Sequence, residues 1–270
     1  MQSKMLGKVV LFYHPEDQET AQVIESACEK AVQLAGDQWG LPEPENCRIY
    51  VMTSWWEFVF QSAPWPWQLL LVQSIPFWVG RVRRTWPYSG GWTQRYGRRV
   101  AIGVKTLSLL EHGDRSIGAH IFVEEKDMKE KVQHITCHEL VHACSAHLKL
   151  PFWLNEGLAM VTVDRFLNKT TIKPETLELL RNYDPKASPP TYREVSRMDG
   201  KAIAYHSVRG YWLVRFLEEK HPGFIRRVFS LHMDARQIEG EMADLFAMQP
   251  ARFWSLIDGL VAGHFESQEV

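Results

Sequence analysis

Cysteine is scarce in this chain, and the spacing of its cysteines suggests no site. The 270 residues include four cysteines, Cys28, Cys47, Cys137 and Cys144. They do not form the closely spaced pairs that are typical of a zinc knuckle. Four cysteines in a chain of this length are also too few for a disulfide framework. We therefore expect reduced thiols and a fold stabilised by a hydrophobic core.

An excess of charge of either sign is also missing. Lysine and arginine number 31 and aspartate and glutamate 32, which gives a net charge of −1 with neutral histidines. A basic surface for nucleic acid requires a positive excess, so we expect no nucleic-acid partner. Hydrophobic residues make up 45% and charged residues 23% of the chain. These values are ordinary for a folded globular protein and exclude a disordered or fibrous one.

A secretory leader is not recognisable at the N-terminus. The apolar stretch from Leu6 to Tyr13 is short, is interrupted by Gly7 and Lys8, and is followed by no cleavage site of small residues. This pattern predicts a cytoplasmic protein and leaves peripheral contact with a membrane open.

An uninterrupted membrane span is lacking, although one segment comes near to it. Residues 58–80 hold no charged side chain over 23 positions, a length that could cross a bilayer. Three prolines and three glutamines within it would leave polar groups unsatisfied in lipid, so we expect no span. The wider segment 55–92 holds seven of the eleven tryptophans. We interpret it as core and cleft wall, and the alternative is an interfacial loop on a membrane surface.

Apolar periodicity divides the chain into two parts. Short apolar runs predict strands at 9–13, 48–52, 99–104 and 117–123, with a helix over 17–35 and a short helix capped by Ser54. Helical spacing then predicts a helix over 126–148, a second over 151–166, and three or four helices over 202–264 after a polar loop at 183–192. The predicted fold class is α+β, with a small N-terminal α/β lobe (1–124) built on a mixed sheet and a helical lobe (125–270), which together form one catalytic unit.

The helix expected at 126–148 carries the sequence His138-Glu139-Leu140-Val141-His142, a match to the H-E-x-x-H pattern. Residues four apart lie one above the other on a helix, so both imidazoles can bind one metal ion from the same side. Glu139 is rotated about 100° from His138 around the helix axis, beside the metal rather than on it. That is the position of a general base.

A third ligand would complete a catalytic zinc site. Zinc with three protein ligands keeps a position for water and lowers the pKa of that water to about 7. A carboxylate fourteen residues after His142, near the start of the second helix, can fold back against the first helix and complete a His2Glu set. Glu156 is this candidate, and one zinc ion per chain is the expected cofactor.

The same two segments carry a family resemblance. His138–Ala143 (HELVHA) and Trp153–Ala159 (WLNEGLA) resemble the gluzincin metallopeptidases, in particular the peptidase MA-like group. Weaker similarity extends to Pro76–Gly80 and to Ala204–Ser207. The resemblance implies a zincin-like fold, with the metal site between an α/β lobe and a helical lobe. It also implies zinc on His138, His142 and Glu156, with Glu139 as the activator of water.

The resemblance implies one further role, and the chain departs from it at one position. Gluzincins often place a tyrosine on a helix that faces the zinc, which implies that Tyr205 stabilises the oxyanion. Tyr211 and His206 are the alternatives. Thermolysin-like enzymes carry an aspartate four residues after the third ligand, where this chain has Met160. The hydrogen-bond partner of the zinc histidines is therefore not predicted.

The expected reaction is the hydrolysis of a peptide bond in a peptide or protein substrate by water bound to zinc. Glu139 takes the proton of the water and passes it to the leaving amine, while Tyr205 and zinc stabilise the oxyanion. An extended substrate could pair with the edge of the strand at 99–104 or at 117–123. The alternative is a module without catalysis that binds a metal, a protein or a membrane surface on the same scaffold.

Overall fold

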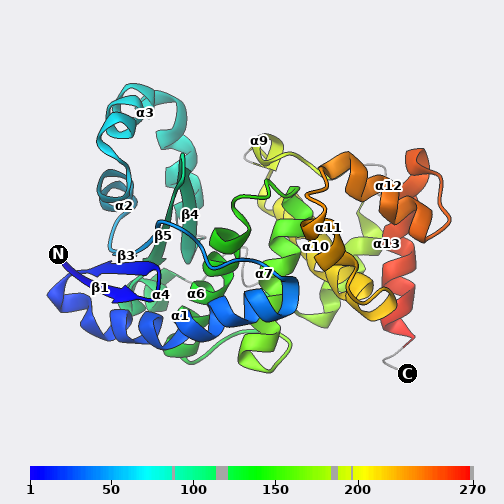
Figure 1. The fold of residues 1–270 in the computed structure, drawn as a ribbon, viewed down its shortest axis with the longest axis horizontal. Helices are drawn as coiled ribbons and strands as arrows, with labels where there is room; N and C mark the ends of the chain where they lie inside the picture. The colour runs from blue at the N-terminus through cyan, green and yellow to red at the C-terminus, as the bar shows by residue number, and fades with distance from the viewer. Residues whose placement is uncertain (87–88, 114–120, 184–187, 196, 268–270) are drawn as a thin grey trace.

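A mixed sheet organises the N-terminal part of the molecule (Figure 1). The computed structural model describes residues 1–86, 89–113, 121–183, 188–195 and 197–267. The strands are β1 (Gln2–Leu6), β2 (Val9–Tyr13), β3 (Cys47–Met52), β4 (Gly91–Tyr96) and β5 (Arg99–Lys105). Their spatial order is β1-β2-β3-β5-β4, with β2, β3 and β5 parallel and the outer strands β1 and β4 antiparallel to their neighbours.

Helices cover both faces of this sheet. Helices α1 (Gln18–Trp39) and α6 (Met128–Ser145) pack on one face, and α2 (Trp55–Ser62) and α3 (Trp65–Thr85) pack on the other. Side chains alternate across a strand, so Ile49 and Val51 join the core with α1, whereas Tyr50 and Met52 join the core with α2. The parallel strands are mainly apolar because both of their faces are largely buried, with Arg48, Arg99 and Lys105 as the charged exceptions.

The C-terminal part consists mainly of helices. Its elements are α7 (Phe152–Leu167), α8 (Leu177–Asn182), α9 (Tyr192–Val195), α10 (Gly200–Lys220), α11 (Phe224–Ser230), α12 (Ala235–Leu245) and α13 (Pro250–Glu266). Helix α4 (Leu107–Gly113) lies between β5 and α6 in the sequence. A large core joins α7, α10 and α13. Between Ala202 and His264 the structure has four helices, as the sequence predicts.

Most predicted elements are confirmed, and the differences have local causes. The strands at 9–13, 48–52 and 99–104 are present. Strand β1 escaped prediction because it is a largely exposed edge strand with no apolar alternation. Helix α1 continues through Gly36 to Trp39 and ends where Gly40 adopts a left-handed φ of 73°. Of the strand expected at 117–123, residues 117–120 lie outside the described part, and Phe122 forms an isolated bridge with Ile172.

The aromatic segment 55–92 agrees with the predicted core segment only in part. Its first half agrees with a core segment, because α2 buries Trp55 and Phe58, and the backbone N–H of Glu57 donates to the Ser54 hydroxyl that caps it. Its second half is the long helix α3, not a loop, and this helix leaves large apolar side chains exposed, including Phe77 at 89%. No helix of the described residues is both long and apolar enough to cross a membrane.

Helix α6 links the two parts of the chain. Val132, Cys137 and Leu140 pack into the core under the sheet, whereas Val141 and Cys144 of the same helix join the helical core with α7. Helix α6 follows the boundary expected at residue 124, but its side chains belong to the cores on both sides of that boundary. Side chains on α6 are consequently held from both sides, which favours a precise site there.

Candidate metal centre

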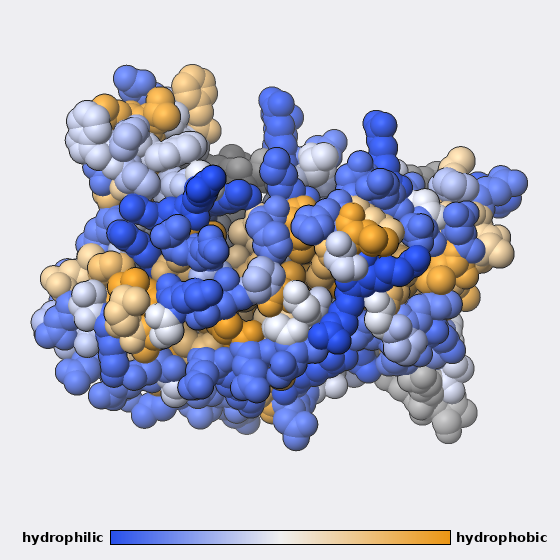
Figure 2. Space-filling view, in the orientation of Figure 1, coloured by the Kyte–Doolittle hydropathy of each residue, from blue (hydrophilic) through white to orange (hydrophobic). Residues whose placement is uncertain are grey.

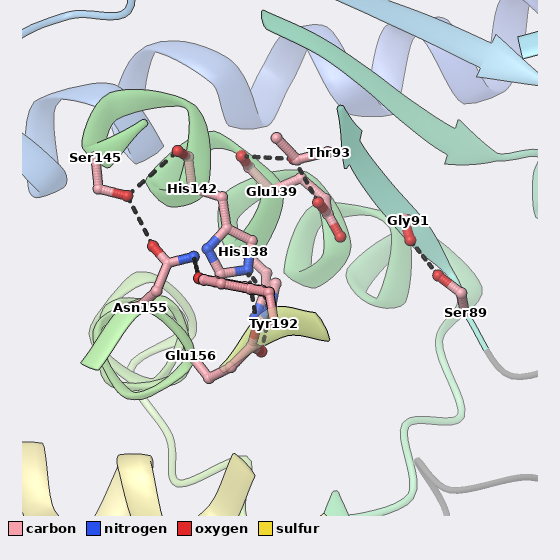
Figure 3. Close-up of polar contacts among 10 residues, drawn as sticks. All are labelled: Ser89, Gly91, Thr93, His138, Glu139, His142, Ser145, Asn155, Glu156 and Tyr192. Atoms are coloured by element: carbon pink, nitrogen blue, oxygen red, sulfur yellow. Dashed lines mark hydrogen bonds and ion pairs between the residues drawn. The ribbon is translucent and has the colours of Figure 1, made fainter. Parts of the chain in front are cut away.

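Helix α6 directs two imidazoles to one place. The Asp127 carboxylate accepts a hydrogen bond of 2.8 Å from the backbone N–H of Lys129 and caps the helix. His138 and His142 follow one turn apart, with ring centroids 4.6 Å apart and nearly perpendicular rings. Their Nε2 atoms lie 3.0 Å from each other. The two nitrogens thus face a common point (Figure 3).

Helix α7 supplies a carboxylate to the same point. It begins after Pro151, beyond a short turn in which Lys149 has a left-handed φ of 52°. Glu156 Oε2 lies 3.5 Å from His138 Nε2, and Glu156 Oε1 lies 3.5 Å from His142 Nε2. One ligand atom of each of the three side chains lies within 4.8 Å of the others. The turn therefore folds α7 back against α6 and brings the three predicted ligands together.

The distances in this cluster suit a tetrahedral zinc ion. Zinc binds imidazole nitrogen and carboxylate oxygen at about 2.0–2.2 Å, so neighbouring ligand atoms of a tetrahedron lie about 3.3–3.5 Å apart. The separations here are 3.0 and 3.5 Å. Two imidazole nitrogens and a carboxylate face one another at these distances, and one cation between them could be bound by all three. The residues present therefore fit a His2Glu metal site.

The electrostatics of the cluster favour ligand forms that bind a cation. Burial raises the pKa of Glu156, but His142 and His138 outweigh it, so the net shift is downward. Burial lowers the pKa of His142, and the Glu156 charge opposes this only in part. Burial would also lower the pKa of His138, but its bond with Glu156 raises it overall. Glu156 is thus ionised, His142 is neutral, and a metal would compete with a proton at His138.

The outer nitrogens of the two imidazoles depart from the usual zinc site. Nδ1 of His138 and Nδ1 of His142 are buried and form no hydrogen bond within the part of the chain that the structure describes. Zinc histidines usually donate this N–H to a carboxylate, a carbonyl or water. Met160, which stands where thermolysin-like enzymes have an aspartate, is buried in the helical core. Among the described residues, no hydrogen bond to Nδ1 therefore fixes the orientation of either ring.

Glu139 lies beside the cluster, where α6 meets β4. Its Oε2 accepts a hydrogen bond of 2.6 Å from the Thr93 hydroxyl of β4, and the residue is 8% exposed. The strand can approach this closely because a Cβ atom at Gly91 would lie 2.7 Å from Glu139 Cγ and 2.8 Å from its Oε1. Gly91 therefore leaves space for the carboxylate, and Thr93 fixes its orientation.

Three polar side chains that the sequence pattern does not predict border the ligand cluster (Figure 3). The Ser145 hydroxyl donates to Asn155 Oδ1 at 2.8 Å, and Asn155 Nδ2 donates to the Tyr192 oxygen at 2.8 Å. Burial, followed by the charge of Glu156, raises the pKa of Tyr192, so its hydroxyl keeps its proton. Asn155 could have been predicted near the site, because it directly precedes Glu156 in the sequence. Tyr192 reaches the site only through the tertiary fold.

Tyr205 requires a correction, because its hydroxyl is engaged elsewhere. The side chain is fully buried and donates a hydrogen bond of 2.6 Å to Asp258 Oδ2 of α13. The same carboxylate accepts a hydrogen bond from Arg209. A phenol whose proton is held by a buried carboxylate has no proton left for an oxyanion. The structure therefore gives Tyr205 a place in the helical core in place of the predicted catalytic role.

The two alternatives to Tyr205, Tyr211 and His206, are also buried in the core. The Tyr211 hydroxyl donates to Asp164 at 2.6 Å. His206 is buried, with its ring 4.7 Å from that of Tyr205. Both belong to α10, which packs closely against α7.

The sheet edge beside the cluster is β4, which differs from both predicted substrate strands. Strand β5, the predicted strand at 99–104, pairs with β3 on one side and with β4 on the other. Both edges of β5 already form backbone hydrogen bonds with neighbouring strands, so the prediction that a substrate pairs with this strand is wrong. Within the described sheet β4 is an outer strand, and the bond from Thr93 to Glu139 ties it to the site.

The cysteines take no part in this centre. All four are free and buried, as expected. Burial raises the pKa of Cys28 and of Cys144 to about 12, and it also raises those of Cys47 and Cys137. Protonated, buried thiols are poor metal ligands and poor nucleophiles.

The two segments that resemble gluzincins thus meet in space, one on α6 and one on α7. Comparisons of the chain with models of known families, with curated proteins and with solved structures gave no match. The case for a metal centre therefore depends on the positions of His138, Glu139, His142 and Glu156.

Proposed function

We propose that this chain is a zinc-dependent metallopeptidase of the gluzincin type, which hydrolyses peptide bonds with water as the nucleophile. The observation that carries the proposal is the convergence of two imidazole nitrogens and a carboxylate at 3.0–3.5 Å, beside a second carboxylate on the same helix. His138, His142 and Glu156 would hold the ion. A zincin-like site then lies where α6, packed on the sheet, meets α7 of the helical part.

Glu139 is the general base of this proposal. Zinc, when bound, lowers the pKa of a water molecule to about 7 and polarises a carbonyl group. Glu139 accepts the proton of the attacking water and delivers it to the nitrogen of the leaving amine. The Thr93 hydroxyl holds Oε2 of this carboxylate at 2.6 Å, which leaves Oε1 to take the proton. A carboxylate fixed in this way needs no reorganisation during the reaction.

Tyr192 takes the role first assigned to Tyr205. Its oxygen accepts a hydrogen bond from Asn155, the neighbour of Glu156 in the sequence, so its own proton can be donated. The raised pKa keeps that proton in place at neutral pH. We assign Tyr192 to donate to the carbonyl oxygen of the substrate as this oxygen gains negative charge.

An extended peptide is the substrate that the surroundings favour. Strand β4 offers its outer edge for antiparallel pairing, the mode in which sheet edges bind extended chains. Gly91 and Thr93 bring this edge within contact of Glu139. A backbone bound along β4 would therefore pass beside the general base.

Metal content is the first test. We expect elemental mass spectrometry to find about one zinc per chain in protein purified without added metal, and a large loss in Glu156→Ala, because zinc needs three protein ligands here. Glu178→Ala is the matched control, since Glu178 is an exposed glutamate on α8. Wild-type protein that holds no zinc after equilibration at neutral pH would contradict the proposal.

Hydrolysis of a peptide library is the second test. We expect Glu139→Gln to retain zinc and to lose activity by about 10²–10⁴-fold, the usual contribution of a general base. Zinc binding without any hydrolysis by the wild type would favour the non-catalytic alternative. Normal cleavage by Glu139→Gln would refute the assignment of the base.

A further inference from the structure

Charge is segregated in this chain, although its total is near zero. Residues 58–110 contain no acidic side chain, and they contain seven basic ones: Arg81, Arg83, Arg84, Arg95, Arg98, Arg99 and Lys105. The rest of the chain holds 24 basic and 32 acidic residues. One stretch of 53 residues thus carries a net charge of +7 and the remainder −8. This stretch contains all of α3 and both strands of the β4–β5 hairpin.

The outward face of α3 is apolar. Phe77 is 89% exposed, Trp65 72% and Leu70 56%, and no charge interrupts the helix before Arg81. Among the described residues, seven of the fourteen exposed large hydrophobic side chains lie between Trp56 and Phe77. Figure 1 shows α3 projecting from the body of the molecule, and Figure 2 shows orange and pale atoms at that end. Such a concentration of exposed apolar surface marks an interaction site.

The inward face of α3 is firmly held, so its exposure is a fixed feature of the fold. The Trp78 ring lies 4.7 Å from that of Trp55 and 5.4 Å from that of Trp56. Near the other end of the helix, the Trp67 ring lies 5.8 Å from that of Tyr96 at the end of β4. Aromatic contacts at both ends therefore orient the helix, and the opposite face, with Leu69, Leu70 and Val72, points away from the core.

Basic residues stand at both ends of this apolar face. Arg83 is exposed in the last turns of α3. Arg98 is exposed in the β4–β5 turn, two residues beyond the ring of Tyr96 that contacts Trp67. Exposed tryptophan and phenylalanine between arginines suit the interface of a bilayer, where rings enter the headgroup region and guanidinium groups meet phosphates.

We propose that α3 is a docking surface for a membrane that contains anionic lipids, with the helix lying in the plane of the interface. The positive charge of this segment favours an anionic membrane over a second copy of the chain. A second copy of the chain, paired through α3 about a two-fold axis, would bring like-charged segments together, which is unfavourable. An anionic surface instead attracts the exposed guanidinium groups of Arg83, Arg95 and Arg98, in a segment that has no acidic side chain to oppose it. The proposal is independent of any peptidase activity.

Vesicle co-sedimentation tests this surface. The probes are vesicles of phosphatidylcholine alone and vesicles with about a quarter of phosphatidylserine. We expect the full chain to bind the anionic vesicles, to bind less as salt increases, and to bind neutral vesicles more weakly. The double variant Leu70→Ser with Phe77→Ser should bind at least about tenfold more weakly, since it removes two exposed apolar anchors. Leu231→Ser with Leu256→Ser is the matched control, because both leucines are exposed outside α3, Leu231 directly after α11 and Leu256 on α13.

Each outcome bears on the proposal. Loss of vesicle binding in Leu70→Ser with Phe77→Ser supports it, provided that the circular dichroism spectrum and the unfolding temperature are unchanged and the control variant still binds. A blue shift of tryptophan fluorescence on addition of anionic vesicles supports it without any variant. Absence of wild-type binding to both kinds of vesicle overturns it. So does a wild-type dimer that the double variant dissociates while vesicle binding is absent.

Discussion

Two tyrosines of this chain differ in what their hydroxyl groups can do. Tyr192 is 50% exposed, and its oxygen accepts a hydrogen bond from Asn155 beside the ligand cluster. Tyr205 is fully buried and donates its hydroxyl hydrogen bond to Asp258. One hydroxyl can therefore act on a substrate, whereas the other stabilises the packing of α10 against α13.

Replacing each tyrosine by phenylalanine should separate these roles. We expect Tyr192→Phe to lower kcat by about a hundredfold, the usual effect of losing one oxyanion donor, with little change in stability. Tyr205→Phe should instead lower the free energy of unfolding by about 1.5–3 kcal/mol, because the charged Asp258 loses a hydrogen bond. Steady-state kinetics on a peptide substrate and urea unfolding give the two readouts. Full activity in Tyr192→Phe would remove Tyr192 from the mechanism.

At the scale of elements, the crossing of α7 and α10 positions Glu156. The helices touch through their backbones: a Cβ atom at Gly157 would lie 2.3 Å from the Gly210 carbonyl oxygen, and one at Gly210 would lie 2.1 Å from the Trp153 carbonyl oxygen. Because Gly157 follows Glu156 directly, the separation of the two helices also sets where Glu156, the proposed third ligand, lies.

Gly157→Ala should therefore disturb both stability and metal binding. Backbone atoms cannot move aside as a flexible side chain can, so we expect a loss of about 1–3 kcal/mol in the free energy of unfolding, together with weaker zinc binding. Urea unfolding and a zinc titration measure the two effects. Gly259→Ala on α13 is the control, since nothing lies within 4 Å of its added Cβ. It should be neutral or stabilising, by up to about 1 kcal/mol. Equal stability of both variants would contradict the close crossing.

A buried histidine on α10 gives the fold a dependence on pH. Burial, followed by the charge of Arg209, lowers the pKa of His206 from 6.5 to about 4. The unfolded chain takes up this proton at a higher pH than the folded protein, so the free energy of unfolding falls as the pH drops from about 6.5 to about 4. His206→Gln should make this dependence shallower in urea unfolding across that window. An unchanged slope would mean that His206 contributes nothing to it.

In the molecule as a whole, the three candidate ligands come from two helices that contribute to different cores. His138 and His142 lie on α6, which completes the core under the sheet, and Glu156 lies on α7, in the helical core. An ion held by all three would bind the folded chain and not the unfolded one. Its free energy of binding would therefore add to stability.

Removal of metal should accordingly lower the unfolding temperature. With zinc at about a hundred times its dissociation constant, binding contributes about 2.7 kcal/mol. This corresponds to a decrease of about 5 °C or more when a chelator is added. Calorimetry of the wild type and of Glu156→Ala, each with and without chelator, measures it. A chelator effect of equal size in both proteins would place the metal elsewhere.

Features that depend on local geometry could be predicted from the order of the residues. The helical period places His138 and His142 one turn apart, and apolar runs marked three strands and most helices, because these patterns express contacts within a few residues. The fold was needed to learn which tyrosine reaches the cluster, which strand forms the sheet edge beside it, and that α3 exposes its apolar face. Tyr192, β4 and α3 owe their positions to contacts between distant segments. Such contacts depend on how helices and strands pack against one another, which no local pattern encodes.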